Sequence, residues 1–124
     1  PDIRMIPIGG FSVPEEFASI TSMDSVLALS FGRRSSTLRS ILQSARLAGA
    51  DTVSLTDQVS SGFPNLAKVT LRCRTQGLSY FDSVAAPVSV ITHLCATVAK
   101  QIGQNAVERL RYIESIHSDW GGAN

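Results

Sequence analysis

"VLALSFGRRSSTLRSILQSARLAGADTVSLTD", from Val26 to Asp57, is the stretch that decides the fold of this chain. Its opening apolar run, within Asp24–Phe31, is typical of a β-strand that is buried on both faces. A turn of small, hydroxyl-bearing and basic residues follows, and a helical pattern comes after the turn. The sequence therefore puts polar groups directly after a buried strand, where ligands bind in open parallel sheets.

The helical pattern after this turn is amphipathic. Ser35 or Ser36 is placed to cap its beginning, and Gly49 fits the left-handed conformation that commonly ends a helix. The spacing of three, one and three residues between apolar positions predicts a single buried stripe, which consists of Leu38, Ile41, Leu42 and Ala45. The next apolar segment, Asp51–Asp57, predicts a second strand.

We expect two further strands and two long helices elsewhere in the chain. The strands are Ile3–Gly10, which a glycine pair ends, and Val69–Thr75, whose alternation is typical of an edge strand. A largely apolar helix is expected from Asp82 or Ser83 to about Gly103, and its composition predicts burial at a subunit interface. A last helix carries one face with Val107, Leu110, Ile113, His117 and Trp120.

The order of these elements predicts the fold class. Short connections between alternating strands and helices require right-handed crossovers and therefore a parallel sheet. We predict an α/β fold, a three-layer α/β/α sandwich around a parallel sheet, in one domain that spans residues 1–124. Because the sequence has no initiator methionine and opens almost directly on a strand, we expect the chain to be a fragment of a longer protein.

Composition excludes several classes of protein. The 124 residues are 44% apolar, as expected of one globular domain, and the net charge of +1 provides no broad basic surface for nucleic acid or membrane. Cys73 and Cys95 lie in apolar surroundings without metal-binding spacing, so we expect buried, reduced thiols in a cytoplasmic protein. The chain has no apolar run of about 20 residues, which a membrane span needs, and no signal-peptide pattern.

The polar turn has the groups that bind phosphate. A helix N-terminus offers unpaired N–H groups and about half a positive charge, and Gly32 allows the backbone to approach a ligand closely. The candidate ligand-binding residues are Ser30, Gly32, Arg33, Arg34, Ser35, Ser36, Thr37 and, from the end of the next strand, Thr56. The alternative interpretation is that a serine only caps the helix, the arginines are solvated and Thr56 closes its strand.

No catalytic or metal-binding pattern accompanies this turn. The nucleotide motifs GxxxxGK[ST] and GxGxxG are both absent. His93 and His117 follow helical apolar patterns and are interpreted as packing residues, and no carboxylate is placed to pair with either of them. We therefore predict no catalytic residue, no metal site and no cofactor.

Four segments are informative when taken together: LSFGRRSSTLRSILQSARLAGADTVSLTD, LAKVTLRCRT, YFDSVAAPVSVITHLCATVAKQIG and ERLRYIESIHSDW. In this order they resemble the sugar isomerase (SIS) domain of RpiR-family transcriptional regulators, from about Asp2 to Trp120. The resemblance implies an α/β/α domain that binds a phosphorylated sugar. It also implies a homodimer or higher oligomer through the helix at 82–103, and DNA binding only through a helix-turn-helix domain that this chain lacks.

The sequence departs from the SIS pattern in two places. The first SIS strand and helix, with their Gly-x-Gly-x-Ser turn, are absent, which leaves four of the usual five strands. SIS domains commonly read Ser-x-Ser-Gly-x-Thr, whereas here Ser30 matches the first serine, Gly32 stands at the second, and the turn looks one residue short. Either Ser35 or Ser36 replaces the missing hydroxyl, or ligand binding is weakened or changed.

Three functions remain open at this point. The first is a sugar-phosphate-sensing domain of a transcriptional regulator. The second is an aldose–ketose phosphate isomerase that uses the same phosphate-binding turn, although the sequence does not show a convincing base. The third is a vestigial SIS fold that is kept for dimerisation.

Overall fold

The structure is a computed structural model, and it describes residues 3–6, 13–32, 36–57, 66–77 and 80–121. The chain divides into two units, Pro1–Pro87 and Val88–Asn124. Its elements, in chain order, are α1 (Val13–Phe17), β1 (Ser25–Ser30), α2 (Ser36–Leu47), β2 (Asp51–Asp57), β3 (Val69–Cys73), α3 (Ala85–Ile102) and α4 (Gln104–Gly121).

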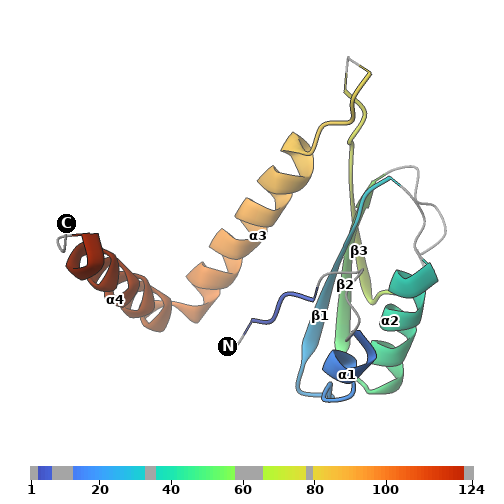
Figure 1. The fold of residues 1–124 in the computed structure, drawn as a ribbon, viewed down its shortest axis with the longest axis horizontal. Helices are drawn as coiled ribbons and strands as arrows, with labels where there is room; N and C mark the ends of the chain where they lie inside the picture. The colour runs from blue at the N-terminus through green and yellow to red at the C-terminus, as the bar shows by residue number, and fades with distance from the viewer. Residues whose placement is uncertain (1–2, 7–12, 33–35, 58–65, 78–79, 122–124) are drawn as a thin grey trace. The chain divides into compact units, whose positions relative to one another are not determined.

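The three strands form one parallel sheet in the order β1-β2-β3 (Figure 1). β1 pairs with β2 from Ser25 opposite Asp51 to Ser30 opposite Thr56. Because α2 connects two neighbouring parallel strands, it runs back along the sheet and begins at the edge where the strands end (Figure 1). The predicted α/β fold with a parallel sheet is confirmed.

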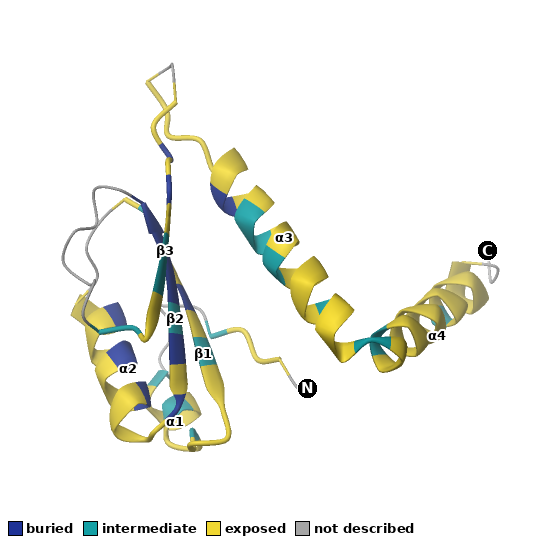
Figure 2. Ribbon diagram, turned by 180° about the vertical axis from the view of Figure 1, so that it is seen from behind, coloured by how far each residue is buried: buried dark blue, intermediate teal, exposed yellow. Residues whose placement is uncertain are grey.

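Helix α2 covers one face of the sheet and forms the core of the first unit. Its buried residues are the four that the sequence predicts: Leu38, Ile41, Leu42 and Ala45. Leu38 and Leu42 pack with Ala28 of β1, and Leu66 packs against this cluster. The buried stripe of α2 is visible in Figure 2.

Gly49 ends α2 in a Schellman motif. The Ala50 N–H donates to the Ala45 carbonyl and the Gly49 N–H to the Arg46 carbonyl, each at 3.0 Å. Gly49 has a φ of 81°, and a Cβ added there would lie 3.2 Å from the Ser22 Cβ. The position therefore favours glycine for its backbone conformation, and a larger residue would also contact Ser22 tightly.

The two faces of the sheet differ in chemistry. The face beneath α2 carries buried hydroxyls from Ser30, Thr52, Ser54 and Thr56. On the opposite face, Leu27 and Leu29 are each 45% exposed. The expectation that β1 is buried on both faces is therefore wrong for this unit, in which α2 is the described helix that packs on the sheet.

The strand predicted at Ile3–Gly10 is not found in its described part. Residues 3–6 adopt no regular structure, and Ile3 and Met5 are 88% and 91% exposed. An apolar segment becomes a strand only where another strand provides its hydrogen bonds, and no described strand lies beside this one. Residues 7–10 lie outside the described part of the chain, so the described residues contain three strands rather than the four expected.

Helices α3 and α4 meet at Gly103, which has a φ of 73°. The Ala85 N–H donates to the Ser83 Oγ at 3.3 Å, so Ser83 caps α3, and Pro87 is tolerated in its first turn. Pro87 is the one described residue of α3 that is buried. The described residues of α3 and α4 thus do not by themselves provide the burial that is expected for this apolar helix.

The two cysteines have different environments. Both are free thiols, but Cys73 is buried and Cys95 is exposed on α3, so the prediction of two buried thiols is wrong for Cys95.

No described helix is both long enough and apolar enough to cross a bilayer. The described residues contain no group of three or more histidine, cysteine or acidic side chains that could hold a metal ion.

Candidate functional site

The candidate site lies at the edge of the sheet where the strands end. β1 ends at Ser30 and α2 begins at Ser36, a few residues later. Ser30 and Thr56 are register partners, and both are buried, so their side chains lie on the same face of the sheet. The fold thus brings together Ser30, Thr56 and the first turn of α2, as the sequence predicts.

Thr56 has a buried hydroxyl that no described group satisfies. The residue is 2% exposed, and its Oγ1 has no hydrogen-bond partner in the described structure. Burying a hydroxyl without a partner costs about 1–3 kcal/mol, and native proteins rarely accept this cost without a reason. A ligand atom at the strand ends would provide the missing partner. Thr70 Oγ1 shares this condition, but Thr70 pairs with Ser54, two residues farther from this edge.

Gly32 provides the bend between β1 and α2. Its φ is 85°, and a Cβ added there would meet no atom within 4 Å. The backbone conformation, rather than crowding, is therefore the reason for glycine at this position. The open space beside it is consistent with the predicted close approach of a ligand.

Asp57 also belongs to the site, although the sequence did not assign it there. The Gly32 N–H donates to the Asp57 Oδ2 at 2.6 Å, which joins the end of β2 to the turn after β1. Asp57 is 3% exposed. The signal that could have found it is its position, because it follows Thr56 at the end of a strand that is parallel to β1.

The remaining candidates are described only in part. Ser36 and Thr37 are exposed in the first turn of α2, where their hydroxyls are accessible. Arg33, Arg34 and Ser35 lie outside the described residues. The structure thus brings together five of the eight predicted residues, Ser30, Gly32, Ser36, Thr37 and Thr56.

Cys73 lies beside the site but is not suited to nucleophilic chemistry. Its Sγ donates to the Thr56 carbonyl at 3.7 Å, and it pairs in register with Asp57. Burial, and secondly the negative charge of Asp57, raise the pKa of the Cys73 thiol above its ordinary value of 9.0. The thiol is therefore protonated at neutral pH, whereas the thiolate is the reactive form.

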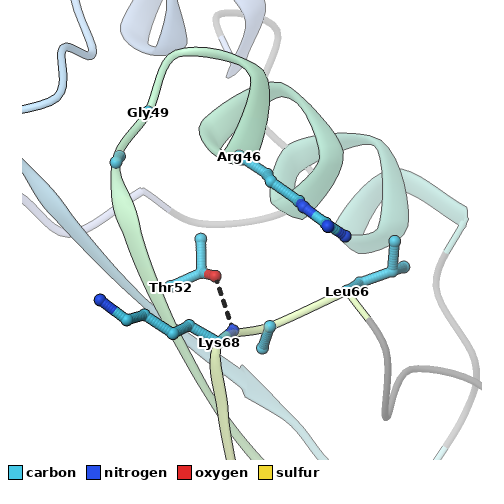
Figure 3. Close-up of a pocket in the computed structure, with 7 residues that line it drawn as sticks. Arg46, Gly49, Thr52, Leu66 and Lys68 are labelled. Atoms are coloured by element: carbon cyan, nitrogen blue, oxygen red, sulfur yellow. Dashed lines mark hydrogen bonds between the residues drawn. The ribbon is translucent and has the colours of Figure 1, made fainter.

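A cavity of about 320 Å³ lies near the opposite edge of the sheet, where β2 and β3 begin (Figure 3). Its lining residues are Arg46, Gly49, Ala50, Thr52, Leu66, Ala67 and Lys68. The polar groups of Lys68 are engaged within the protein. Its backbone N–H donates to the Thr52 Oγ1 at 3.0 Å, and its Nζ lies 2.7 Å from the Asp51 Oδ1. This cavity is therefore a weaker candidate for an anion than the turn.

The chain is similar in fold to a solved structure, the sugar isomerase domain of an RpiR transcription factor from Sphaerobacter thermophilus. The two structures superpose with a TM-score of 0.77 and share 24% sequence identity, over 89% of this chain and 62% of that chain. This chain has a sugar isomerase fold. The predicted resemblance is confirmed at the level of the fold. No family model matches the sequence, and no curated protein matches it either.

Within this SIS fold, the groups described at the strand ends are hydrogen-bond donors and acceptors. The described site has hydroxyls, a helix N-terminus and one carboxylate, which already accepts the Gly32 N–H. Both histidines of the chain, His93 and His117, are exposed on α3 and α4, and residues 1–87 contain none. The chain spans 62% of the length of the matched domain.

Proposed function

We propose that this chain is the sugar-phosphate-binding effector domain of an RpiR-type transcriptional regulator of carbohydrate metabolism, and that it acts in the cytoplasm. The observation that carries the proposal is the buried hydroxyl of Thr56, which has no hydrogen-bond partner among the described residues and lies beside Ser30, at the edge where α2 begins. In this proposal the domain is a sensor rather than an enzyme, and DNA is bound by a domain outside this chain.

The chemistry of the site supports a phosphorylated ligand. The first turn of α2 offers backbone N–H groups and the positive end of the helix dipole, which stabilise an anion. Exposed hydroxyls at Ser36 and Thr37 add donors, and in this proposal the Thr56 hydroxyl contacts either the phosphate or the sugar. Arg33 and Arg34 add positive charge in this proposal. A sugar phosphate satisfies both the charged and the hydroxyl-bearing parts of such a site.

We further propose that the chain forms a homodimer or higher oligomer through α3. This helix is apolar in sequence, yet Val88 and Val98 are 55% and 48% exposed in the single chain. A helix of this composition gains free energy when a second copy covers it. Ligand binding would regulate DNA binding if the ligand prefers one arrangement of the subunits.

The test compares phosphorylated with unphosphorylated sugars. We expect hexose phosphates to raise the melting temperature of the protein and the parent sugars to leave it unchanged, because a ligand that binds only the folded state stabilises it. Ser30→Ala should lose more affinity than Ser54→Ala, which removes a buried hydroxyl from the same face farther from the edge.

Two outcomes would contradict this function, and a third would contradict the assignment of the turn. Conversion of aldose to ketose phosphates by the purified protein would favour the isomerase. A flat melting response to the whole panel would leave the vestigial dimerisation fold. Equal losses of affinity in Ser30→Ala and Ser54→Ala would show that the turn has been assigned wrongly.

A further inference from the structure

The turn after β1 already holds an anionic group of the protein itself. The Asp57 Oδ2 accepts the Gly32 N–H at 2.6 Å, which is a short hydrogen bond to a carboxylate. Gly32 lies at the bend that leads to α2, so its N–H belongs to the group of donors that a phosphate at this edge would use. One of these donors is therefore occupied before any ligand arrives.

The Asp57 carboxylate acts on its surroundings through its charge. It is 97% buried, since only 3% of the residue is exposed, and water therefore screens it poorly. Its negative charge is one of the two causes that raise the pKa of Cys73, its register partner on β3. The same charge acts on any anion that enters beside Gly32, and like charges in a poorly screened site repel one another.

We propose that Asp57 determines the ligand charge that the site accepts, by competing with the ligand anion for the Gly32 N–H. This inference rests on the proposed sugar-phosphate function and adds a specificity-determining residue to it. The resident carboxylate disfavours a dianionic phosphate monoester and tolerates a monoanionic phosphate diester or a similar singly charged group. The remaining hydroxyls bind the polar body of the ligand, among them Thr56 Oγ1, which has no partner in the described part of the chain.

The substitution Asp57→Asn distinguishes the effect of the negative charge of Asp57 from its effect on the structure of the turn. Asparagine keeps an oxygen that accepts the Gly32 N–H, so the turn retains its hydrogen bond while the negative charge is lost. We expect Asp57→Asn to bind glucose 6-phosphate roughly tenfold more tightly than the wild type does, because the like-charge repulsion is removed. A residue that only held the turn in shape would weaken binding or leave it unchanged on the same substitution.

The control is Asp51→Asn, the same chemical change at an exposed carboxylate that pairs with Lys68 near the opposite edge of the sheet. Isothermal titration calorimetry should give the wild-type affinity for this variant. The second ligand is the methyl phosphodiester of glucose 6-phosphate, which carries one negative charge where the monoester carries about 1.5 to 2 at neutral pH. The wild type should bind this diester at least as tightly as the monoester, and Asp57→Asn should prefer the monoester.

The outcomes separate this inference from the proposed function. If neither protein binds either ester, both proposals are overturned. If the wild type binds the monoester and Asp57→Asn binds it no more tightly, the role of Asp57 is overturned and the phosphate site stands. Should Asp57→Asn fail to fold, the wild type alone decides: tighter binding of the diester supports the inference, and tighter binding of the monoester overturns it.

Discussion

Replacement of Thr56 by valine should make the ligand-free protein more stable and at the same time impair ligand binding. Valine has almost the shape of threonine but lacks the hydroxyl. Thr56 Oγ1 is buried without a partner among the described residues, so its removal abolishes a desolvation cost of about 1–3 kcal/mol. For a chain of this size, 1 kcal/mol corresponds to roughly 3–6 °C in melting temperature.

The expected rise for Thr56→Val is therefore about 3 °C or more in thermal unfolding followed by circular dichroism. Thr70→Val is the matched control, because its hydroxyl is also buried without a described partner but lies farther from the strand ends. Both variants should gain stability. Only Thr56→Val should lose the additional stabilisation that a hexose phosphate confers.

Two results would refute this reasoning. A fall in melting temperature for Thr56→Val would mean that the hydroxyl already has a partner in solution and contributes to the free energy of unfolding. An unchanged response to ligand in this variant would mean that the hydroxyl is not part of the binding site, and its burial would then have no functional explanation.

Four further predictions test the fold and its surfaces. Gly49→Ala should lower the free energy of unfolding by about 1–2 kcal/mol in urea titrations, because alanine is strained at a φ of 81° and its Cβ would crowd Ser22; no loss would contradict the cap. Native protein should react with a thiol reagent at Cys95 and not at Cys73, and equal labelling would contradict the burial of Cys73. Because the folded state holds the Cys73 proton more tightly than the unfolded chain does, stability should fall as the pH rises above about 9.0, and a Cys73→Ala variant should lose less stability over this range. Val98→Glu should reduce the oligomer to monomer in light scattering, whereas an unchanged mass would exclude this part of α3 from the interface.

The elements that the sequence predicted correctly are those that local patterns determine. The buried stripe of α2 follows from the spacing of its apolar residues, and Gly49 was recognisable as a cap because few other residues adopt its conformation. The bounds of β2 agree with the predicted Asp51–Asp57. The position of Ser30 and Thr56 at the same edge followed from the rule that parallel strands end there, and the structure adds that the two residues are register partners.

The features that the sequence did not predict depend on partners far away in the chain or outside it. An apolar segment such as Ile3–Ile6 forms a strand only beside another strand, and its own residues do not reveal whether one is there. The contact of Asp57 with Gly32 joins residues 25 positions apart, so it depends on strand register rather than on a local motif. Whether α3 is buried likewise depends on what packs against it, and its composition does not reveal this.

The central claim is that the strand ends and the first turn of α2 bind an anionic sugar. The most direct measurement is the titration of isotope-labelled protein with a hexose phosphate, followed through the backbone amide signals in nuclear magnetic resonance spectra. We predict saturable shifts at Gly32, Ser36 and Thr37, with Lys68 at the opposite cavity unaffected. Shifts confined to Lys68 and its neighbours, or no shifts at any ligand concentration, would contradict the account.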